Sequence, residues 1–186
     1  MKEVFFTSDT HFNHSGILNI CNRPFRTVEE MNEVIIANWN KTVSDDDTVY
    51  HLGDFCLGDV DSWARVRSRL NGHIHLIAGN HDLKNIRQGI DGLFDSVEMQ
   101  CQLVIEKHTI ILNHYPFLCY SGAYKDEVWQ LFGHVHTRKN NTGVDAHRLK
   151  HLLPNQYDVG VDNNNFSPVS YEQIKTIITK QQKKRW

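Results

Sequence analysis

The chain has 186 residues, of which 40% are hydrophobic and 23% are charged, and its formal net charge is −2. These values are typical of one globular domain, which we expect to cover residues 1–186, and the charge gives no reason to expect a long nucleic acid as a partner. No apolar run approaches the roughly 20 residues that span a bilayer. The N-terminus lacks a secretory pattern, so we expect a cytoplasmic protein with no membrane partner.

The four cysteines, Cys21, Cys56, Cys101 and Cys119, are scattered and form no Cys-x-x-Cys pair. In a chain without a secretory pattern they are expected to be reduced thiols. Cys56 lies two residues after Asp54 and could be a soft metal ligand. Its alternation with Asp54 favours a buried thiol instead.

Short polar segments follow apolar runs at several points along the chain. In chain order they are Asp9-Thr10-His11, Gly53-Asp54, Gly79-Asn80-His81-Asp82, Asn113-His114 and Gly133-His134-Val135-His136. A buried strand that ends in Asp, Asn or His brings that side chain to the rim of a sheet, where open α/β folds bind their ligands. Each segment alone could be a turn or could contain a hydrogen-bonded core histidine. Their repetition in one chain favours a shared site.

Two helices are predicted between the first and third polar segments. Thr27 and Glu30 form a capping box in front of helical spacing over about 28–41. Asp61 is expected to open a second helix that stops at Asn71-Gly72. A further short helix is predicted to begin at Asp82, which could cap it or could orient His81. Strands that alternate with helices predict a sheet covered on its faces.

The second half of the chain is richer in strands. Segments Ser96–Val104 and Ile110–Leu112 have no long helix between them, which predicts a second and more antiparallel sheet. Residues 157–162 alternate like a closing strand. Ser170 and Gln173 then form a capping box for a last helix, which we expect to pack on the body of the domain.

The residue types in the polar segments suit transition metals. Asp9 and His11 are two residues apart, so in an extended segment they point the same way and can hold one ion together. His134 and His136 share this spacing, although a turn between them could place them on two different ions. A mixture of oxygen and imidazole ligands fits manganese, iron, zinc or nickel better than magnesium or calcium. We therefore expect two divalent transition metal ions as cofactors.

In their order along the chain and in their residue types, the polar segments over residues 9–136 resemble the motifs of the calcineurin-like metallophosphoesterases. This resemblance implies a four-layer α/β/β/α sandwich of two mixed sheets flanked by helices, with a dinuclear metal site at the strand ends. Many members of the family carry a supporting aspartate where this chain has Leu57. The ligands that the resemblance implies are Asp9, His11 and His136 for one ion, Asn80, His114 and His134 for the other, and Asp54 as the bridge.

The implied activity is hydrolysis of a small phosphate mono- or diester by a hydroxide that bridges the two ions. His81 resembles the family histidine that protonates the leaving group or stabilises the charge of the transition state. Arg23 could make a bidentate contact to phosphate, or it could be an exposed loop arginine beside a buried Phe25. His14 could contact the substrate or stabilise its loop.

Two other functions are compatible with the same residues. The first is a catalytically silent scaffold that binds a partner, but every position matched to the family pattern, including His81, is intact and this favours an enzyme. The second is a nucleotide phosphodiesterase or a nuclease. No stripe of basic and aromatic residues supports a long nucleic-acid groove, whereas a cyclic or linear nucleotide would need none.

Overall fold

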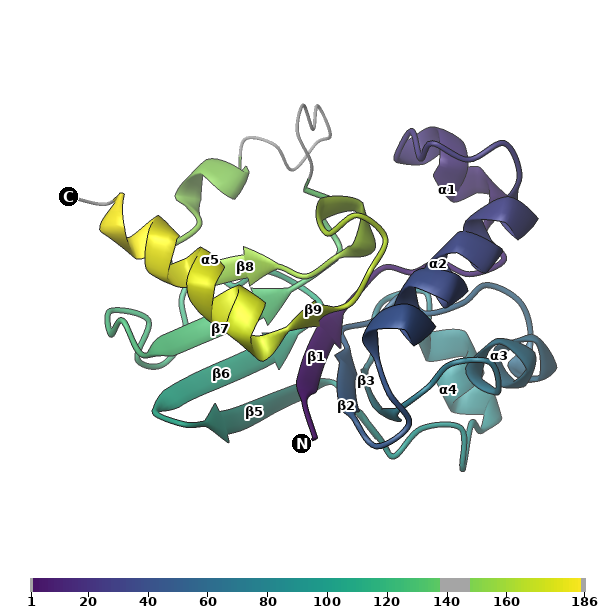
Figure 1. Cartoon of the computed structure of the whole chain (residues 1–186), viewed down its shortest axis with the longest axis horizontal. Helices are drawn as coiled ribbons and strands as arrows, with labels where there is room; N and C mark the ends of the chain where they lie inside the picture. The colour runs from purple at the N-terminus through teal and green to yellow at the C-terminus, as the bar shows by residue number, and fades with distance from the viewer. Residues whose placement is uncertain (1, 138–147, 185–186) are drawn as a thin grey trace.

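The computed structural model describes residues 2–137 and 148–184 and contains two β-sheets (Figure 1). The first sheet has the order β4-β3-β2-β1-β9. Strands β1 to β4 run parallel, and β9 pairs antiparallel with β1 at one edge. The strands are β1 (Val4–Thr7), β2 (Thr48–His51), β3 (His73–Ile77), β4 (Ser96–Glu98) and β9 (Val169–Ser170).

The second sheet has the order β5-β6-β7-β8. Its strands are β5 (Gln100–Ile105), β6 (His108–Asn113), β7 (Val128–Phe132) and β8 (Gln156–Asp158). Only β5 and β6 pair antiparallel, while β6, β7 and β8 run parallel. The second sheet is thus more antiparallel than the first, as expected, because β5 and β6 pair along their whole length whereas β1 and β9 pair at only two positions, but its other two pairings are parallel. Residues 114–127 return the chain from the end of β6 to the start of β7 without a helix, so the usual signal of a parallel crossover is missing from the sequence.

The predicted strand segment Ser96–Val104 is divided between the two sheets. Its first part is β4, which pairs with β3, and its second part lies in β5, which pairs with β6. The predicted closing strand over 157–162 is also too long. β8 ends at Asp158, whose carboxylate accepts the Gly160 N–H at 2.7 Å, and a short 3-10 helix, η2 (Val161–Asn163), follows.

The helices begin where side chains cap them. Thr27 caps α2 (Val28–Thr42) as predicted, but the Glu30 carboxylate accepts the Arg26 N–H, so only half of the expected capping box forms. Helix α3 (Val60–Arg67) begins after Asp59 rather than at Asp61, because the Asp59 carboxylate accepts the Ser62 N–H. Helix α5 (Tyr171–Lys183) has the full predicted capping box. The short elements are α1 (Ser15–Ile20), α4 (Leu83–Gln88) and η1 (Arg148–His151).

Strand alternation divides the buried side chains into two cores. Phe5, Val49 and Ile74 point from the first sheet toward α2 and α3, where Trp39 and Trp63 are fully buried. The second core lies between the two sheets. From the first sheet and its strand ends it contains Phe6, Leu52 and Ile77, and from the second sheet and α5 it contains Ile110, Leu112, Leu131, Ile174 and Ile178. Two mixed sheets with flanking helices confirm the predicted α/β class (Figure 1).

None of the described helices is long and apolar enough to cross a bilayer. The arrangement of the parallel strands determines where the polar segments lie. β1, β2 and β3 of the first sheet and β6 and β7 of the second each end directly before one of the polar segments. The two sheets therefore present these segments to one another at the carboxyl ends of their strands, the position at which α/β folds place their sites.

Candidate metal centre

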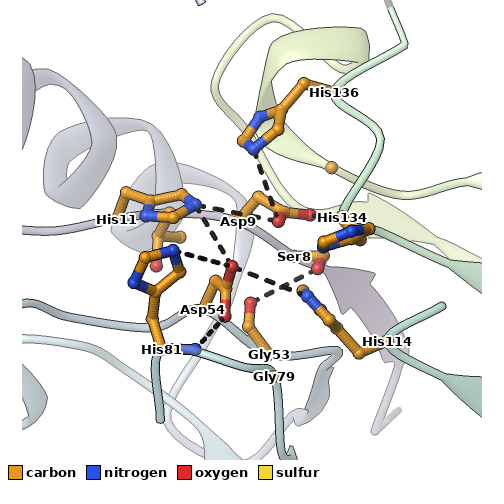
Figure 2. A network of polar contacts seen from close by, with 12 residues as sticks. Ser8, Asp9, His11, Gly53, Asp54, Gly79, His81, His114, His134 and His136 are labelled. Atoms are coloured by element: carbon orange, nitrogen blue, oxygen red, sulfur yellow. Dashed lines mark hydrogen bonds and ion pairs between the residues drawn. The ribbon is translucent and has the colours of Figure 1, made fainter. Parts of the chain in front are cut away.

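Side chains from all five polar segments meet at the ends of these strands (Figure 2). Asp9 and His11 follow β1, Asp54 follows β2, and His81 follows β3. His114 follows β6, and His134 and His136 follow β7. The structure thus brings together residues that are up to about 125 positions apart, as the hydrogen bond from the His134 N–H to Asp9 Oδ2 at 2.9 Å illustrates.

The backbone is left-handed at five of these residues. Asp9, His11, Asp54, His134 and His136 have φ values of 57°, 48°, 55°, 70° and 46°. Such values are uncommon for residues other than glycine and cost free energy unless the surrounding structure imposes them. The segments after β1, β2 and β7 therefore leave their strands through left-handed turns. Strain of this kind is concentrated at functional sites.

Two glycines let the segments approach one another. A Cβ atom on Gly79 would collide with the Asp54 carboxylate, and one on Gly133 would collide with Ser8 Oγ and the Asp9 carboxylate. Backbone from β3 and β7 therefore lies directly against the carboxylates that follow β1 and β2. The glycines of the predicted segments are needed for this close approach.

One group of possible ligands comprises Asp9, His11 and His136. Asp9 Oδ1 lies 3.8 Å from Nε2 of His11 and 3.8 Å from Nε2 of His136. A second group comprises Asp54, His114 and His134, whose donor atoms all lie within 4.8 Å of one another. Asn80 belongs beside this second group, because its Oδ1 lies 3.2 Å from His114 Nε2.

Asp54 connects the two groups. Its Oδ2 lies 3.5 Å from His11 Nε2 on one side and 3.5 Å from His114 Nε2 on the other (Figure 2). Its Oδ1 accepts the His81 N–H at 2.9 Å, which leaves Oδ2 directed into the centre of the site. The Asp54 carboxylate is 3% exposed, and burial raises its pKa above the ordinary value. A bound cation would reverse that effect.

Several atoms in the centre lack the partners that buried polar atoms normally have. Among the described residues, Asp9 Oδ1 and His11 Nε2 are buried without a hydrogen-bond partner. His114 Nδ1 lies 2.7 Å from the Leu52 carbonyl, to which it can only donate, so in the neutral ring Nε2 carries a lone pair. That lone pair faces the oxygens of Asn80 and Asp54. Lone pairs that converge in this way are suited to a cation, so the residues present fit metal ions.

Like His114, the imidazoles of His136 and His11 are each oriented by a contact at the nitrogen that faces away from the centre. His136 Nδ1 pairs with Asp162 Oδ2 at 2.8 Å, and His11 Nδ1 lies 3.2 Å from His14 Nδ1. Carboxylates and carbonyls that hold the second nitrogen of a histidine are the usual support of metal-binding imidazoles. The contact of His14 to His11 favours the loop-stabilising role of His14 over direct contact with substrate.

The pKa values differ between the imidazoles. Burial, together with the positive potential of His136 and Arg23, holds the pKa of His11 well below its usual value, so His11 is a neutral donor. Burial also acts to lower the pKa of His136, but the hydrogen bonds to Asp162 and Cys21 and the negative charge of Asp9 together outweigh it and raise this pKa to about 11. A cation at Nε2 of His136 must therefore displace a proton.

The expectation that Arg23 contacts phosphate is not supported by its surroundings. Arg23 is buried, and its five N–H groups are directed at Asp162, at the carbonyls of Asp9 and Thr10, and at Met31 Sδ. No donor remains for a substrate. The alternative of an exposed loop arginine is wrong for the same reason. Arg23 instead joins the backbone after β1 to Asp162 and so supports His136 indirectly.

Asp82 occupies the N-cap position of α4, but its side chain makes no capping hydrogen bond and does not contact His81. Its carboxylate accepts the N–H groups of Asp54 at 2.8 Å, Phe55 at 3.0 Å and Gly79 at 2.8 Å. Both proposed roles of Asp82 are therefore corrected. The side chain turns away from the helix and fastens the loop after β2 to the loop after β3.

Cys56 and Leu57 follow Asp54 in the loop after β2. Cys56 is buried and accepts a hydrogen bond from Asn13, and burial raises the pKa of its thiol to about 12, as expected for an inert core thiol. Leu57, at the position where the family pattern often has an aspartate, is 41% exposed. The described cysteines form no disulfide.

Sequence reasoning missed Asp158 and Asp162. Asp162 pairs with both His136 and Arg23, and Asp158 accepts hydrogen bonds from the Thr137 and Gly160 N–H groups. Both carboxylates are buried. A signal was present, because Asp158 ends a short buried strand in the same manner as the aspartates of the other segments, but alternation over 157–162 concealed that ending.

Comparison with known proteins agrees with this geometry. A model of the calcineurin-like phosphoesterase family matches residues 3–168. The chain belongs to this family. Membership, with the clusters of aspartate and histidine side chains, places the chain among metal-dependent phosphoesterases in general.

The relatives extend over most of the chain. An uncharacterized protein of Methanocaldococcus jannaschii is 34% identical and aligns with 97% of this chain and 93% of its own. The gene 66 protein of Mycobacterium phage L5 is 25% identical over 78% of this chain and 88% of that protein. Among solved structures, a protein of unknown function from Aquifex aeolicus superposes with a TM-score of 0.71 at 25% identity, covering 95% of this chain and all of that one.

Proposed function

We propose that the chain hydrolyses phosphate mono- or diesters of small molecules with two divalent transition metal ions. The observation that supports this most strongly is the position of Asp54 Oδ2, 3.5 Å from His11 Nε2 and 3.5 Å from His114 Nε2. One carboxylate oxygen shared by two groups of nitrogen and oxygen donors is the arrangement that a two-metal site requires.

The ligands that the family resemblance implied remain our assignment. Asp9, His11 and His136 would hold one ion, and Asn80, His114 and His134 would hold the other, with Asp54 between them. Manganese fits this mixed set of imidazole and oxygen donors, as do iron, zinc and nickel. Two such ions would neutralise a bound phosphate and lower the pKa of a water molecule held between them.

The chain's own residues supply orientation and a proton. The left-handed turns and the contacts to Asp162, Leu52 and His14 fix the imidazoles before substrate arrives. His81 is the candidate acid, because its side chain is 43% exposed and its Nε2 lies 4.0 Å from Asp54 Oδ2, beside the centre. From there it could give a proton to the departing oxygen.

The choice between enzyme and scaffold rests on His81. A scaffold that only binds a partner would need the ligands but would have no use for a half-exposed histidine directed at the centre. A small nucleotide diester fits the same chemistry as other small esters, and the net charge of −2 gives no support for a long nucleic acid. We also retain a cytoplasmic location as a prediction.

The proposal is tested on protein purified without chelator. Bound metals are measured by elemental analysis, and phosphate monoesters, diesters and cyclic nucleotides are screened with manganese added back. We expect about two ions for each chain and hydrolysis that chelation abolishes. Manganese should restore activity better than calcium.

Two variants give the matched comparison. Asp54→Asn should lose metal and activity more severely than any other single ligand change, since this carboxylate would serve both ions. His73→Asn changes a histidine on β3 whose side chain is 51% exposed, and should leave both unchanged. A single ion for each chain, or full turnover after exhaustive chelation, would contradict the proposal.

A further inference from the structure

A cavity of about 570 Å³ opens beside the candidate metal centre. Its volume lies in the ~300–1,000 Å³ range of small-molecule sites. His134 belongs both to the metal centre and to the lining, so the cavity adjoins the centre. The main lining side chains are Tyr115, Phe117, Leu118, Val135, Leu149 and Leu152.

The lining is mostly apolar and aromatic, and its imidazoles are those of His134 and His151. Among the described residues that line the cavity there is no aspartate, glutamate, lysine or arginine. Leu118 is 84% exposed and Tyr115 is 42% exposed, so two large apolar side chains face solvent next to a charged centre. A polar guest would gain little from such walls, whereas an apolar ring would bury surface against them.

Tyr115 joins the cavity to the metal centre. Its ring packs edge-on against His114 at 4.9 Å and against His134 at 4.7 Å between centroids, and its hydroxyl lies 3.4 Å from Asn80 Oδ1. A group that leaves the centre on this side must pass the Tyr115 side chain. Aromatic rings stack favourably on one another at such separations.

Two buried glutamines of the second sheet hold the wall of the cavity in place. Gln130 of β7, which is fully buried, accepts the Phe117 N–H at 3.1 Å and donates to the Tyr115 carbonyl at 2.9 Å. Gln156 of β8 donates to the Phe117 carbonyl at 2.9 Å and to Gln130 at 2.6 Å. Buried amides therefore pin this loop to the second sheet, so the cavity is formed without a ligand.

We propose that this cavity binds a flat, apolar ring of the ester substrate, an aryl group or a nucleobase, while the phosphate lies at the metal centre. This inference rests on the proposed phosphoesterase function. It makes the substrate an ester that carries a flat ring, rather than an alkyl phosphate or the phosphate of a sugar without a base. Leu118 and Tyr115 are then residues that determine specificity, since they contact the ring and no reacting atom.

The test compares two exposed apolar residues of the same connection between β6 and β7. Leu118→Ser removes a side chain of the cavity, and Tyr124→Ser removes one that is 81% exposed and does not line it. For each variant, kcat/KM relative to the unchanged protein is measured with manganese on 2-naphthyl phosphate and on trifluoroethyl phosphate. The ratio cancels the difference in leaving-group reactivity between the two esters.

We expect Leu118→Ser to lower kcat/KM roughly three- to tenfold for the naphthyl ester and to leave the trifluoroethyl ester unchanged, because only the ring loses buried area. Tyr124→Ser should change neither. Equal losses for both esters, or equal losses for both variants, would overturn the inference.

A second measurement does not depend on turnover. Binding of 2-naphthol and of adenosine, neither of which carries phosphate, is followed by saturation-transfer NMR on manganese-free, zinc-loaded protein. The inference is supported if Leu118→Ser weakens the signal of either ring and Tyr124→Ser preserves it. The compound with the stronger signal, 2-naphthol or adenosine, identifies the type of ring. If the rings bind in this way but no ester is hydrolysed, the proposed function is refuted and the cavity remains a ring-binding site. Absence of ring binding would refute the inference.

Discussion

His81 differs from the other histidines of the centre in its exposure. Its side chain is 43% exposed, whereas those of His11 and His114 are 4% and 1% exposed. The backbone N–H of His81 is fixed by Asp54 Oδ1, so the residue stays beside the centre while its ring remains accessible. A group that exchanges protons with a leaving oxygen needs both properties.

We therefore expect His81→Ala to slow turnover by ~10²–10⁴-fold while both metal ions stay bound. The loss should shrink for nitrophenyl esters, because a weakly basic phenolate needs little protonation. Rates on esters of graded leaving-group pKa, together with the metal content of the variant, check this. If the rate falls equally for good and poor leaving groups, His81 is not a general acid and acts only by stabilising charge in the transition state. Loss of an ion would make His81 a ligand.

His51 shows how burial fixes a protonation state. It is fully buried, its Nδ1 accepts the Gly53 N–H at 3.2 Å, and its Nε2 then donates to Thr10 Oγ1 at 2.9 Å. The Thr10 hydroxyl in turn donates to the Phe55 carbonyl. Burial lowers the pKa of His51 from 6.5 to about 3. A proton on Nδ1 would remove the acceptor of the Gly53 N–H.

The sign of the pH effect follows from these pKa values. The unfolded chain takes up a proton at His51 below about pH 6.5 and the folded chain does not, so His51 makes the fold less stable as the pH falls from 6.5 toward 3. The slope from this one group reaches at most ~1.4 kcal/mol per pH unit. Urea denaturation with chelator at pH 6.5, 5.5 and 4.5 should show a shallower dependence for His51→Asn than for the unchanged protein. The exposed His73→Asn is the control, and parallel curves for His51→Asn and wild type would contradict the argument.

Loops between elements, rather than the strands themselves, hold the centre in shape. Asp82 is fully buried and accepts three N–H groups, from Asp54, Phe55 and Gly79, so one side chain joins the loops after β2 and β3. Burial raises the pKa of Asp82 to about 6 despite these hydrogen bonds. Its removal would leave three buried donors without an acceptor.

For Asp82→Ala we expect a loss of ~3–5 kcal/mol in the free energy of unfolding and weaker metal binding, since each buried unsatisfied donor costs ~1–3 kcal/mol and such costs are not fully additive. Chemical denaturation and elemental analysis measure the two effects. Asp59→Ala is the matched control, because Asp59 caps α3 at the surface and should cost only ~1 kcal/mol without affecting metal content. Similar losses in both variants would show that Asp82 is an ordinary cap.

Local patterns in the sequence could predict the strand ends of the centre but not the contacts between distant segments. Asp9, Asp54 and His114 were predictable because each follows an apolar run, and a strand ending of that kind has a local pattern. The partner of Arg23 was not predictable, since Asp162 is 139 residues away and nothing near Arg23 marks its burial. The parallel pairing of β6 and β7 was missed for a similar reason, because no helix lies in the connection between them.

At the scale of the whole molecule, the candidate ligands come from both sheets. Asp9, Asp54 and Asn80 follow strands of the first sheet, and His114, His134 and His136 follow strands of the second. The apolar core between the sheets joins their inner faces, and metal ions at the strand ends would join their edges. Binding of metal would thus be part of the stability of the fold as well as of its chemistry.

Removal of metal should therefore lower the melting temperature of the whole domain. A ligand that binds only the folded state adds ~2.7 kcal/mol at a concentration 100 times its Kd, for each independent site. Thermal unfolding with manganese and with chelator should differ by several degrees, and by less at pH 5 than at pH 8. The reason is that Asp162, through Nδ1, keeps the His136 ring protonated, and the metal must displace the proton on Nε2. In Asp54→Asn, which lacks the shared carboxylate charge, the manganese-dependent rise should largely disappear, whereas His73→Asn should keep it. An equal rise in Asp54→Asn would place the stabilising ions elsewhere on the protein and separate the strength of the fold from the centre between its sheets.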